Sequence, residues 1–147
     1  MERIKKVLMT KQGKRFFARN TNSDLHTQFG FIKKSDLSKK SGSKVVSNTK
    51  MEFAIFPPSF IDIYQKIKRD AQIIPLKDIG AIITETGVNK NSKVVDAGSG
   101  SGALACFLAN IAKEVTTYEI REDFVKIVKT NIDFLNLKNI KIKNKYI

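Results

Sequence analysis

The sequence predicts an α/β protein in which a small antiparallel β-domain precedes the first half of a doubly wound domain, with the order β-α-β-α-β. Short apolar segments separated by polar turns fill residues 1–56, which is typical of antiparallel strands. From residue 93 onward, β-branched runs alternate with helical patterns. Gly98, Gly100 and Gly102 follow the first of these runs. We expect three parts: a basic β-rich domain (1–57), connecting helices (58–92) and an incomplete α/β domain (93–147).

Composition is consistent with a protein that builds its own hydrophobic core. The chain has 147 residues, of which 41% are hydrophobic, and this is the usual share for a globular domain. No apolar stretch approaches the roughly 18 residues of a membrane span, and no signal peptide is evident. Cys106 is the only cysteine, so a disulfide within the chain is excluded. We expect a cytoplasmic protein that does not bind membranes.

Positive charge is concentrated at the N-terminus. Residues 1–50 contain 13 Lys/Arg and 3 Asp/Glu, whereas residues 93–147 contain 9 and 6. A clustered basic region is typical of a surface that binds a polyanion, and phosphate contacts dominate non-specific affinity for nucleic acids. The alternative is that a Lys-, Asn- and Ile-rich composition simply provides a solvated surface.

The N-terminal elements are predicted from turn signals. Gln12-Gly13 and Asn48-Thr49-Lys50 are expected to be hairpin turns, and Ser38–Lys44 is a polar loop. The predicted strands are 6–11, 15–19, 29–33, 45–46 and 51–56.

Two helices are expected in the connecting region. Ser59 with Asp62 three residues later resembles a capping box, and apolar residues at helical spacing predict a helix over 59–69. Pro75 precedes a second helix, with Asp78 in its first turn and Gly87 as its C-terminal stop.

The last 55 residues predict alternating strands and helices. The first helix is apolar on every side, as expected of a helix packed against a sheet, and the second is amphipathic. The predicted strands are Lys93–Ala97, Val115–Ile120 and Ile140–Ile147, and the predicted helices are Ala103–Ala112 and the segment from Phe124 to Leu135.

The glycine-rich turn predicts a site for the adenosine half of a nucleotide-like cofactor. Glycines between a strand and a helix let a ligand approach the backbone closely. Asp96 ends the first strand, and Glu119 stands 21 residues after Gly98 at the end of the second, where a carboxylate can accept both ribose hydroxyls. The Gly-x-Gly-x-Gly spacing favours S-adenosylmethionine over NAD. A turn that binds nothing is the structural alternative.

Val94–Leu104 together with Tyr118–Phe124 resembles the archaeal-type tRNA (adenine-N1)-methyltransferases that modify T-loop adenosines. The resemblance continues upstream in His26–Gly30, Pro58–Asp62 and Gln72–Asp78, and so covers essentially the whole chain. This chain departs from the family in two places. Leu76 separates Pro75 from the Lys-Asp pair, and Phe124 occupies a position near an arginine of some relatives.

The resemblance implies a Rossmann-like methyltransferase domain with S-adenosyl-L-methionine as cofactor and tRNA as partner. It also implies that the intact enzyme is a homotetramer and that the segment around Gln72 lies near the cofactor. The expected cofactor-binding residues are Asp96, Gly98, Ser99, Gly100, Ser101, Gly102, Ala103 and Glu119.

The family's catalytic aspartate lies in later strands, so no residue before Ile147 receives a catalytic role. We therefore expect this chain to be an N-terminal part that is inactive alone, and expect activity when the missing segment is supplied in cis or by a separate chain. The alternatives are a non-catalytic RNA-binding subunit or remnant and, less favoured by the glycine spacing, a nicotinamide-binding fragment.

Three other features carry little chemistry. His26 is the only histidine, and we interpret it as a structural or tRNA-contact residue rather than a catalyst. Cys106 is expected to behave as a small hydrophobic residue. No His, Cys or Asp cluster has the spacing of metal ligands.

Overall fold

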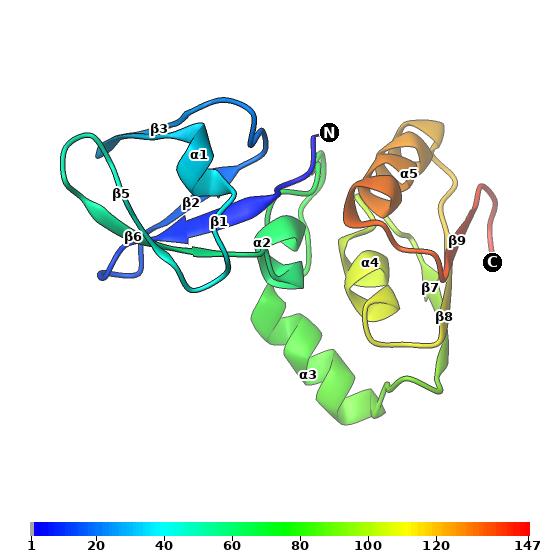
Figure 1. Cartoon of the computed structure of the whole chain (residues 1–147). Helices are drawn as coiled ribbons and strands as arrows, with labels where there is room; N and C mark the ends of the chain where they lie inside the picture. The colour runs from blue at the N-terminus through cyan, green and yellow to red at the C-terminus, as the bar shows by residue number, and fades with distance from the viewer. Residues whose placement is uncertain (1) are drawn as a thin grey trace. The chain divides into compact units, whose positions relative to one another are not determined.

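The computed structural model describes residues 2–147, which divide into two compact units, residues 2–63 and residues 64–147 (Figure 1). The first contains the predicted antiparallel strands and the second the predicted β-α-β-α-β segment. The α/β fold class is therefore confirmed.

The first unit is built on a four-stranded antiparallel sheet with the order β2-β1-β6-β5. The central strand β1 pairs with β2 through Val7 and Phe17, and with β6 through Val7 and Phe56. Gly13 adopts a φ of +80° in the predicted hairpin turn, so the turn at Gln12-Gly13 is confirmed. The strands are β1 (Lys6–Met9), β2 (Arg15–Ala18), β5 (Lys44–Val46) and β6 (Glu52–Phe56).

A second, two-stranded hairpin holds the His26–Gly30 motif. It joins β3 (Leu25–Thr27) to β4 (Gly30–Ile32), and only the second of these strands was predicted. Phe31 donates its backbone N–H to Asn48 Oδ1 at 2.7 Å, and Asn48 returns its own N–H to the Phe31 carbonyl at 3.0 Å. Strand β3 has only three residues, of which one is the exposed His26, so it lacks the apolar run that predicts a strand. The one-turn helix α1 (Lys34–Leu37) follows.

The core of the first unit comes from the inward faces of its strands. Leu8, Ile55 and Ile32 are fully buried, and Phe16 packs edge-on against both Phe29 and Phe53, with ring centroids 5.9 and 5.8 Å apart. The other buried members of this core are Ala18, Leu37, Val45 and Phe53.

The first connecting helix is much shorter than predicted. Helix α2 spans Phe60–Tyr64 instead of 59–69. Its start is as expected, because the Asp62 carboxylate accepts the Ser59 backbone N–H at 2.9 Å and the Ser59 hydroxyl at 2.6 Å. Its end differs because Lys68 gives its backbone N–H to the side chain of Asn131 rather than to a helical carbonyl.

The second connecting helix agrees with the turn signals. Helix α3 spans Leu76–Thr86, with Pro75 as its N-cap. Gly87 ends it with a φ of +65°, a left-handed conformation that glycine adopts readily.

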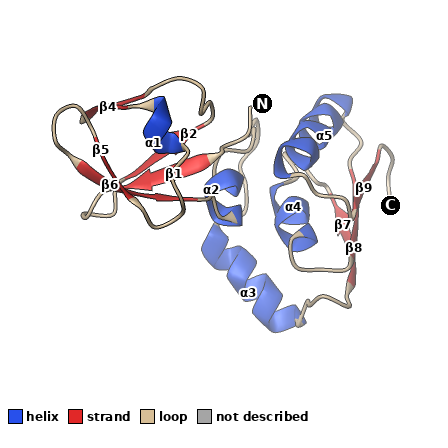
Figure 2. Ribbon diagram, viewed as in Figure 1, coloured by secondary structure: helices blue, strands red, loops and turns tan. Residues whose placement is uncertain are grey.

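The second unit contains a parallel sheet with the order β7-β8-β9. Helices α4 and α5 lie on one side of it (Figure 2), where Ala105, Cys106 and Leu108 pack with Val115 and Ile140. The elements are β7 (Lys93–Ala97), α4 (Ala103–Ala109), β8 (Glu114–Tyr118), α5 (Glu122–Leu135) and β9 (Ile140–Lys143).

Three boundaries in this unit fall earlier than predicted. Helix α4 ends at Ala109, where Asn139 Nδ2 donates to the Ala109 and Ala112 carbonyls at 2.8 and 2.9 Å. Strand β8 ends at Tyr118, and β9 ends at Lys143, whose carbonyl accepts the Glu119 N–H at 3.0 Å.

The sheet face turned away from α4 and α5 is open. Lys93, Val95 and Ala97 alternate toward it along β7, and Val95 leaves 61% of its surface exposed. On the same face, the Lys143 ammonium lies 5.3 Å from the centroid of the Tyr118 ring. Within residues 2–147, no helix combines the length and hydrophobicity needed to cross a bilayer.

Candidate cofactor-binding site

The glycine turn is tied to the end of the neighbouring strand. It leaves β7 after Ala97, and Gly98 and Ser99 both donate their backbone N–H to the Tyr118 carbonyl, at 2.9 and 3.1 Å. These bonds fix the loop at the carboxyl ends of β7 and β8, the edge where doubly wound sheets bind ligands.

The three glycines serve two different purposes. A Cβ added to Gly98 or Gly100 would meet no atom within 4 Å, so both positions border open space. A Cβ on Gly102 would lie 3.0 Å from both Cγ atoms of Val128. The backbone at Gly98 and Gly100 is therefore open to a ligand, whereas Gly102 lets α4 pack against α5.

Glu119 lies directly beside the glycine turn, as the spacing predicted. Its side chain is buried, and one carboxylate oxygen accepts the Gly100 N–H at 2.9 Å. The other oxygen accepts the N–H groups of Ile120 and Arg121 at 2.9 and 3.0 Å. The carboxylate thus holds a fixed orientation at the edge of the open space.

Asp96 lies one strand position before the turn. It is half-buried, and its carboxylate accepts the Thr117 hydroxyl at 2.5 Å. The carboxylate is therefore anchored to β8, and its contact with a cofactor stays a prediction.

The remaining predicted site residues differ in accessibility. Among the described residues, Ser99 Oγ is the one buried side-chain polar atom without a hydrogen-bond partner. A polar atom of this kind is normally satisfied, and the contact of Ser99 with a cofactor stays a prediction. Ser101 and Ala103, in contrast, are 2% and 4% exposed, and the Ser101 hydroxyl is engaged by protein backbone.

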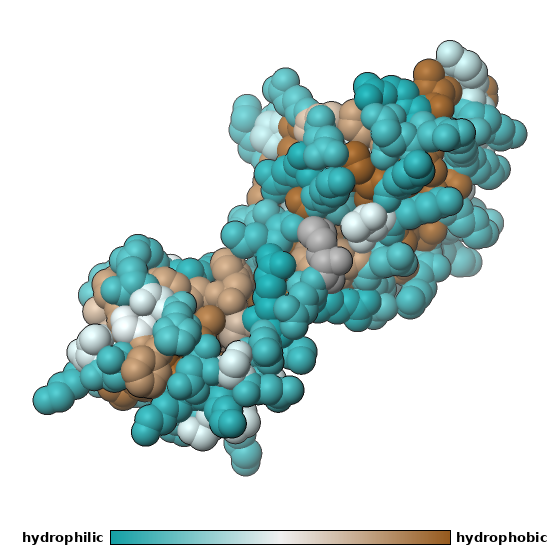
Figure 3. Space-filling view, turned by 90° about the horizontal axis from the view of Figure 1, so that it is seen from above, coloured by the Kyte–Doolittle hydropathy of each residue, from teal (hydrophilic) through white to brown (hydrophobic). Residues whose placement is uncertain are grey.

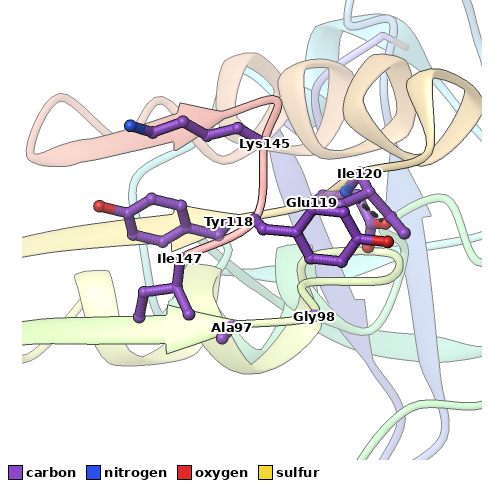
Figure 4. A pocket seen from close by; sticks show the side chains of 8 residues that line it. Ala97, Gly98, Tyr118, Glu119, Ile120, Lys145 and Ile147 are labelled. Atoms are coloured by element: carbon purple, nitrogen blue, oxygen red, sulfur yellow. Dashed lines mark hydrogen bonds between the residues drawn. The ribbon is translucent and has the colours of Figure 1, made fainter.

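A cavity of about 310 Å³ adjoins the turn (Figure 4). Ala97 and Gly98 form one side of it, and Tyr118, Glu119 and Ile120 form another. The last three residues of the chain, 145–147, complete the lining, which the sequence did not predict. The cavity is mainly apolar with one buried carboxylate at its edge, a combination suited to a nucleoside.

Two residues that sequence reasoning overlooked hold the segment before α3 against this turn. Asn131 is fully buried, and Tyr64 donates its hydroxyl to the Ala103 carbonyl at 3.2 Å. Burial raises the pKa of Tyr64 to about 12, so the phenol remains a hydrogen-bond donor. The available signal was Asn131 itself, a polar residue within the apolar stripe of α5.

The two departures from the family pattern differ in exposure: Leu76 is exposed, whereas Phe124 is buried in helix α5. Lys77 and Asp78 form an exposed ion pair at 3.3 Å. The Arg121 guanidinium lies 4.1 Å from the centroid of the Phe124 ring and pairs with Asp123 at 2.6 Å.

The residues expected to carry little chemistry are placed as follows. Cys106 is fully buried, and burial, with a smaller effect of the Asp96 charge, raises its pKa to about 12. The prediction that it behaves as a small hydrophobic residue is confirmed.

His26 is exposed on β3, with its ring centroid 5.9 Å from that of Phe31. Within residues 2–147, no group of three or more His, Cys, Asp or Glu side chains is placed to hold a metal ion.

Comparison with known proteins points to methyltransferases. The family model described as ribosomal RNA adenine dimethylase matches residues 73–146. A tRNA (adenine(57)-N(1)/adenine(58)-N(1))-methyltransferase of Methanocaldococcus jannaschii is 32% identical over 130 residues, covering 86% of this chain and 45% of that protein.

Solved structures show the same resemblance in three dimensions. A tRNA (m1A58) methyltransferase of Aquifex aeolicus matches 95% of this chain and 56% of its own, with 29% identity and a TM-score of 0.79. A SAM-dependent O-methyltransferase of Thermotoga maritima matches 99% and 57%, with 27% identity and a TM-score of 0.82. The chain therefore spans about half the length of these relatives, and the relatives themselves differ in the atom that accepts the methyl group.

Proposed function

Because this chain belongs to the ribosomal RNA adenine dimethylase family of S-adenosylmethionine-dependent methyltransferases, we propose that it is the cofactor-binding part of a tRNA methyltransferase acting on N1 of a T-loop adenosine. The observation that supports this most directly is the turn at Gly98 and Gly100, which is open to a ligand and bordered by the Glu119 carboxylate. The tRNA acceptor is proposed from the Methanocaldococcus and Aquifex relatives.

The cofactor, S-adenosyl-L-methionine, supplies an electrophilic methyl group on a sulfonium. In the proposed site, the backbone at Gly98 and Gly100 packs against it, and the Ser99 hydroxyl gains the hydrogen bond that it lacks. Glu119 keeps one acceptor lone pair for a ribose hydroxyl, on the oxygen that accepts the Gly100 N–H, because its other oxygen already accepts two N–H groups. Asp96 supplies negative charge near the sulfonium. Ser101, Gly102 and Ala103 are proposed to support the loop from its buried side, without touching the cofactor.

The first unit is proposed to bind tRNA phosphates. Residues 2–63 contain 13 Lys/Arg and 5 Asp/Glu, a net charge of +8. Hydrophilic side chains cover much of the molecular surface in view in Figure 3. The exposed lysines offered for this contact are Lys5, Lys33, Lys34, Lys40 and Lys50.

The reaction needs a group at the target base that we assign to no residue of this chain. Methyl transfer requires the adenine nitrogen to be aligned with the methyl group, a base flipped from its stack and management of the exocyclic proton. We propose that the isolated chain binds cofactor without turnover, and that a further segment, in cis or from a separate chain, restores activity. The active form is proposed to be a cytoplasmic homotetramer.

Calorimetric titration of the chain with S-adenosylhomocysteine and with NAD⁺ tests the cofactor. We expect binding of the first and none of the second, and the reverse result would overturn the proposal. Turnover is then measured on T-loop RNA with the chain alone and with the chain extended by the C-terminal half of the Methanocaldococcus relative. A folded extended protein that binds the cofactor but leaves the adenosine unmethylated would overturn the proposed reaction.

The high charge of the first unit favours one second candidate, a non-catalytic RNA-binding subunit. RNA mobility shifts distinguish the two functions. The subunit would be favoured if S-adenosylhomocysteine does not change the affinity for tRNA and the extended protein shows no turnover.

A further inference from the structure

A buried asparagine connects the glycine turn to a segment far away in the sequence. Asn131 has no exposed surface. Its Nδ2 donates to the Lys68 and Ser101 carbonyls, each at 2.9 Å, and its Oδ1 accepts the Lys68 N–H at 2.8 Å. One side chain therefore satisfies both backbone polar groups of Lys68 and one of the turn.

Ser101 makes the complementary contact from the turn. Its hydroxyl oxygen accepts the Asp70 N–H at 3.2 Å and the Ala71 N–H at 3.3 Å. Together with Asn131, it fixes the backbone from 68 to 71 without help from a strand or helix, since this stretch belongs to neither.

The polar character of this contact indicates more than packing. Burying an amide and a hydroxyl is unfavourable unless every partner is present, and here each partner is a backbone group that an apolar pair of the same volume would leave without this hydrogen bond. What the hydrogen bonds add is orientation, because they hold the Lys68 peptide and the two N–H groups at 70 and 71 in one register against the loop.

We infer that Asn131 and Ser101 are positioning residues that set the cofactor affinity of the site by holding segment 68–71 on the glycine turn. The segment leads directly into Gln72, which is exposed, and Ile73, which is half-buried. This inference rests on the proposed function, because it concerns the same cofactor. The inference assigns to Ser101 the support of segment 68–71, instead of a direct contact with the cofactor.

The chain offers a matched control in Asn139. That side chain also donates to backbone carbonyls, those of Ala109 and Ala112, at 2.8 and 2.9 Å. It precedes β9 and thus lies at the opposite end of the parallel sheet from the glycine turn. Asn139→Asp and Asn131→Asp therefore introduce the same chemical change into two similar networks, of which only one touches the proposed site.

The experiment measures S-adenosylhomocysteine binding by calorimetry on the full chain and on Asn131→Asp, Ser101→Ala and Asn139→Asp, after circular dichroism has shown which variants are folded. Ser101→Ala removes one acceptor and keeps the loop backbone, so it remains informative if Asn131→Asp does not fold. We expect Ser101→Ala and Asn131→Asp to weaken binding by about tenfold or more, since each tenfold corresponds to about 1.4 kcal/mol, the scale of one unsatisfied buried group.

Hydrogen exchange of a peptide covering residues 66–75 supplies the second measurement. It should show faster exchange in Ser101→Ala and Asn131→Asp but not in Asn139→Asp. Wild-type affinity in Ser101→Ala, or an equal loss in Asn139→Asp, would overturn the inference and leave the proposed function intact. Absence of binding in the wild-type chain would instead count against the proposed function.

Discussion

The carboxylate of Glu119 accepts the backbone N–H of Gly100 at 2.9 Å, although β8 and the whole of α4 separate the two residues in the chain. The group proposed to recognise the cofactor ribose therefore also shapes the loop on which the cofactor would lie. Loop geometry and ribose recognition are coupled through a single side chain.

Replacing Glu119 with Gln should affect both properties. The amide NH₂ group would face the N–H groups of Gly100 or of Ile120 and Arg121, leaving at least one donor unsatisfied, at about 1–3 kcal/mol of unfolding free energy. We expect this loss together with a reduction of about tenfold or more in S-adenosylhomocysteine affinity. Denaturant unfolding and calorimetry measure the two effects. Glu122→Gln, on the exposed first turn of α5, should change neither.

Substitutions at the glycines should separate packing from binding. Gly102→Ala places a Cβ 3.0 Å from Val128 at a φ of +74°, and we expect a loss of about 1–3 kcal/mol in unfolding free energy. Gly98→Ala also adopts a positive φ but meets no atom, so it should lose less stability and more cofactor affinity. In denaturant unfolding, Gly102→Ala should be less damaging in a Val128→Ala background. Strictly additive losses would contradict the packing argument.

The Asp62 carboxylate should make the first unit sensitive to acid. Burial raises the pKa of Asp62, but hydrogen bonds from Ser59 and the Arg15 guanidinium at 2.7 Å outweigh this and lower it below 3.8. A lowered native pKa stabilises the fold above the unfolded value, about pH 4, and this contribution is lost as the pH falls through the native pKa. Unfolding free energies from neutral to acid pH should therefore show Asp62→Asn less stable than wild type at pH 7, with the difference shrinking below about pH 4. A constant difference would contradict this assignment.

Cys106 should be unreactive in the folded protein. Burial raises its pKa to about 12, and the thiolate is the form that attacks thiol reagents. We expect no reaction with an aromatic disulfide reagent at pH 8 in native buffer, and reaction of one thiol per chain in denaturant. Rapid native labelling would show that helix α4 opens far more often than its packing indicates.

The elements that the sequence predicted are those whose signals are local. The strand–turn–helix around Gly98 and the capping of α3 by Pro75 and Gly87 follow from patterns within a few residues. The proximity of Glu119 to the turn follows from the parallel pairing of β7 and β8.

Other features depend on partners distant in the sequence. The early end of α2 results from a bond between Lys68 and Asn131, which are 63 positions apart. Strand β3 gains its order from a hairpin that Asn48 completes with side-chain and backbone hydrogen bonds. The packing role of Gly102, as distinct from the open positions of Gly98 and Gly100, depends on the location of Val128, which is 26 residues away in the sequence.

The open sheet face around Val95 has a consequence for handling the protein. An exposed apolar strand is a template for self-association, and natural sheets guard such strands with charged residues that act as gatekeepers. Lys93 lies at the start of β7 on this face, and Lys143 lies on the same face of β9, next to Lys141, whose charge is paired with Glu114 at 3.1 Å. Repulsion between the Lys93 and Lys143 cations of different copies keeps the copies apart and is screened by salt. Solubility should therefore fall as ionic strength rises, so dilute buffer is the better storage condition.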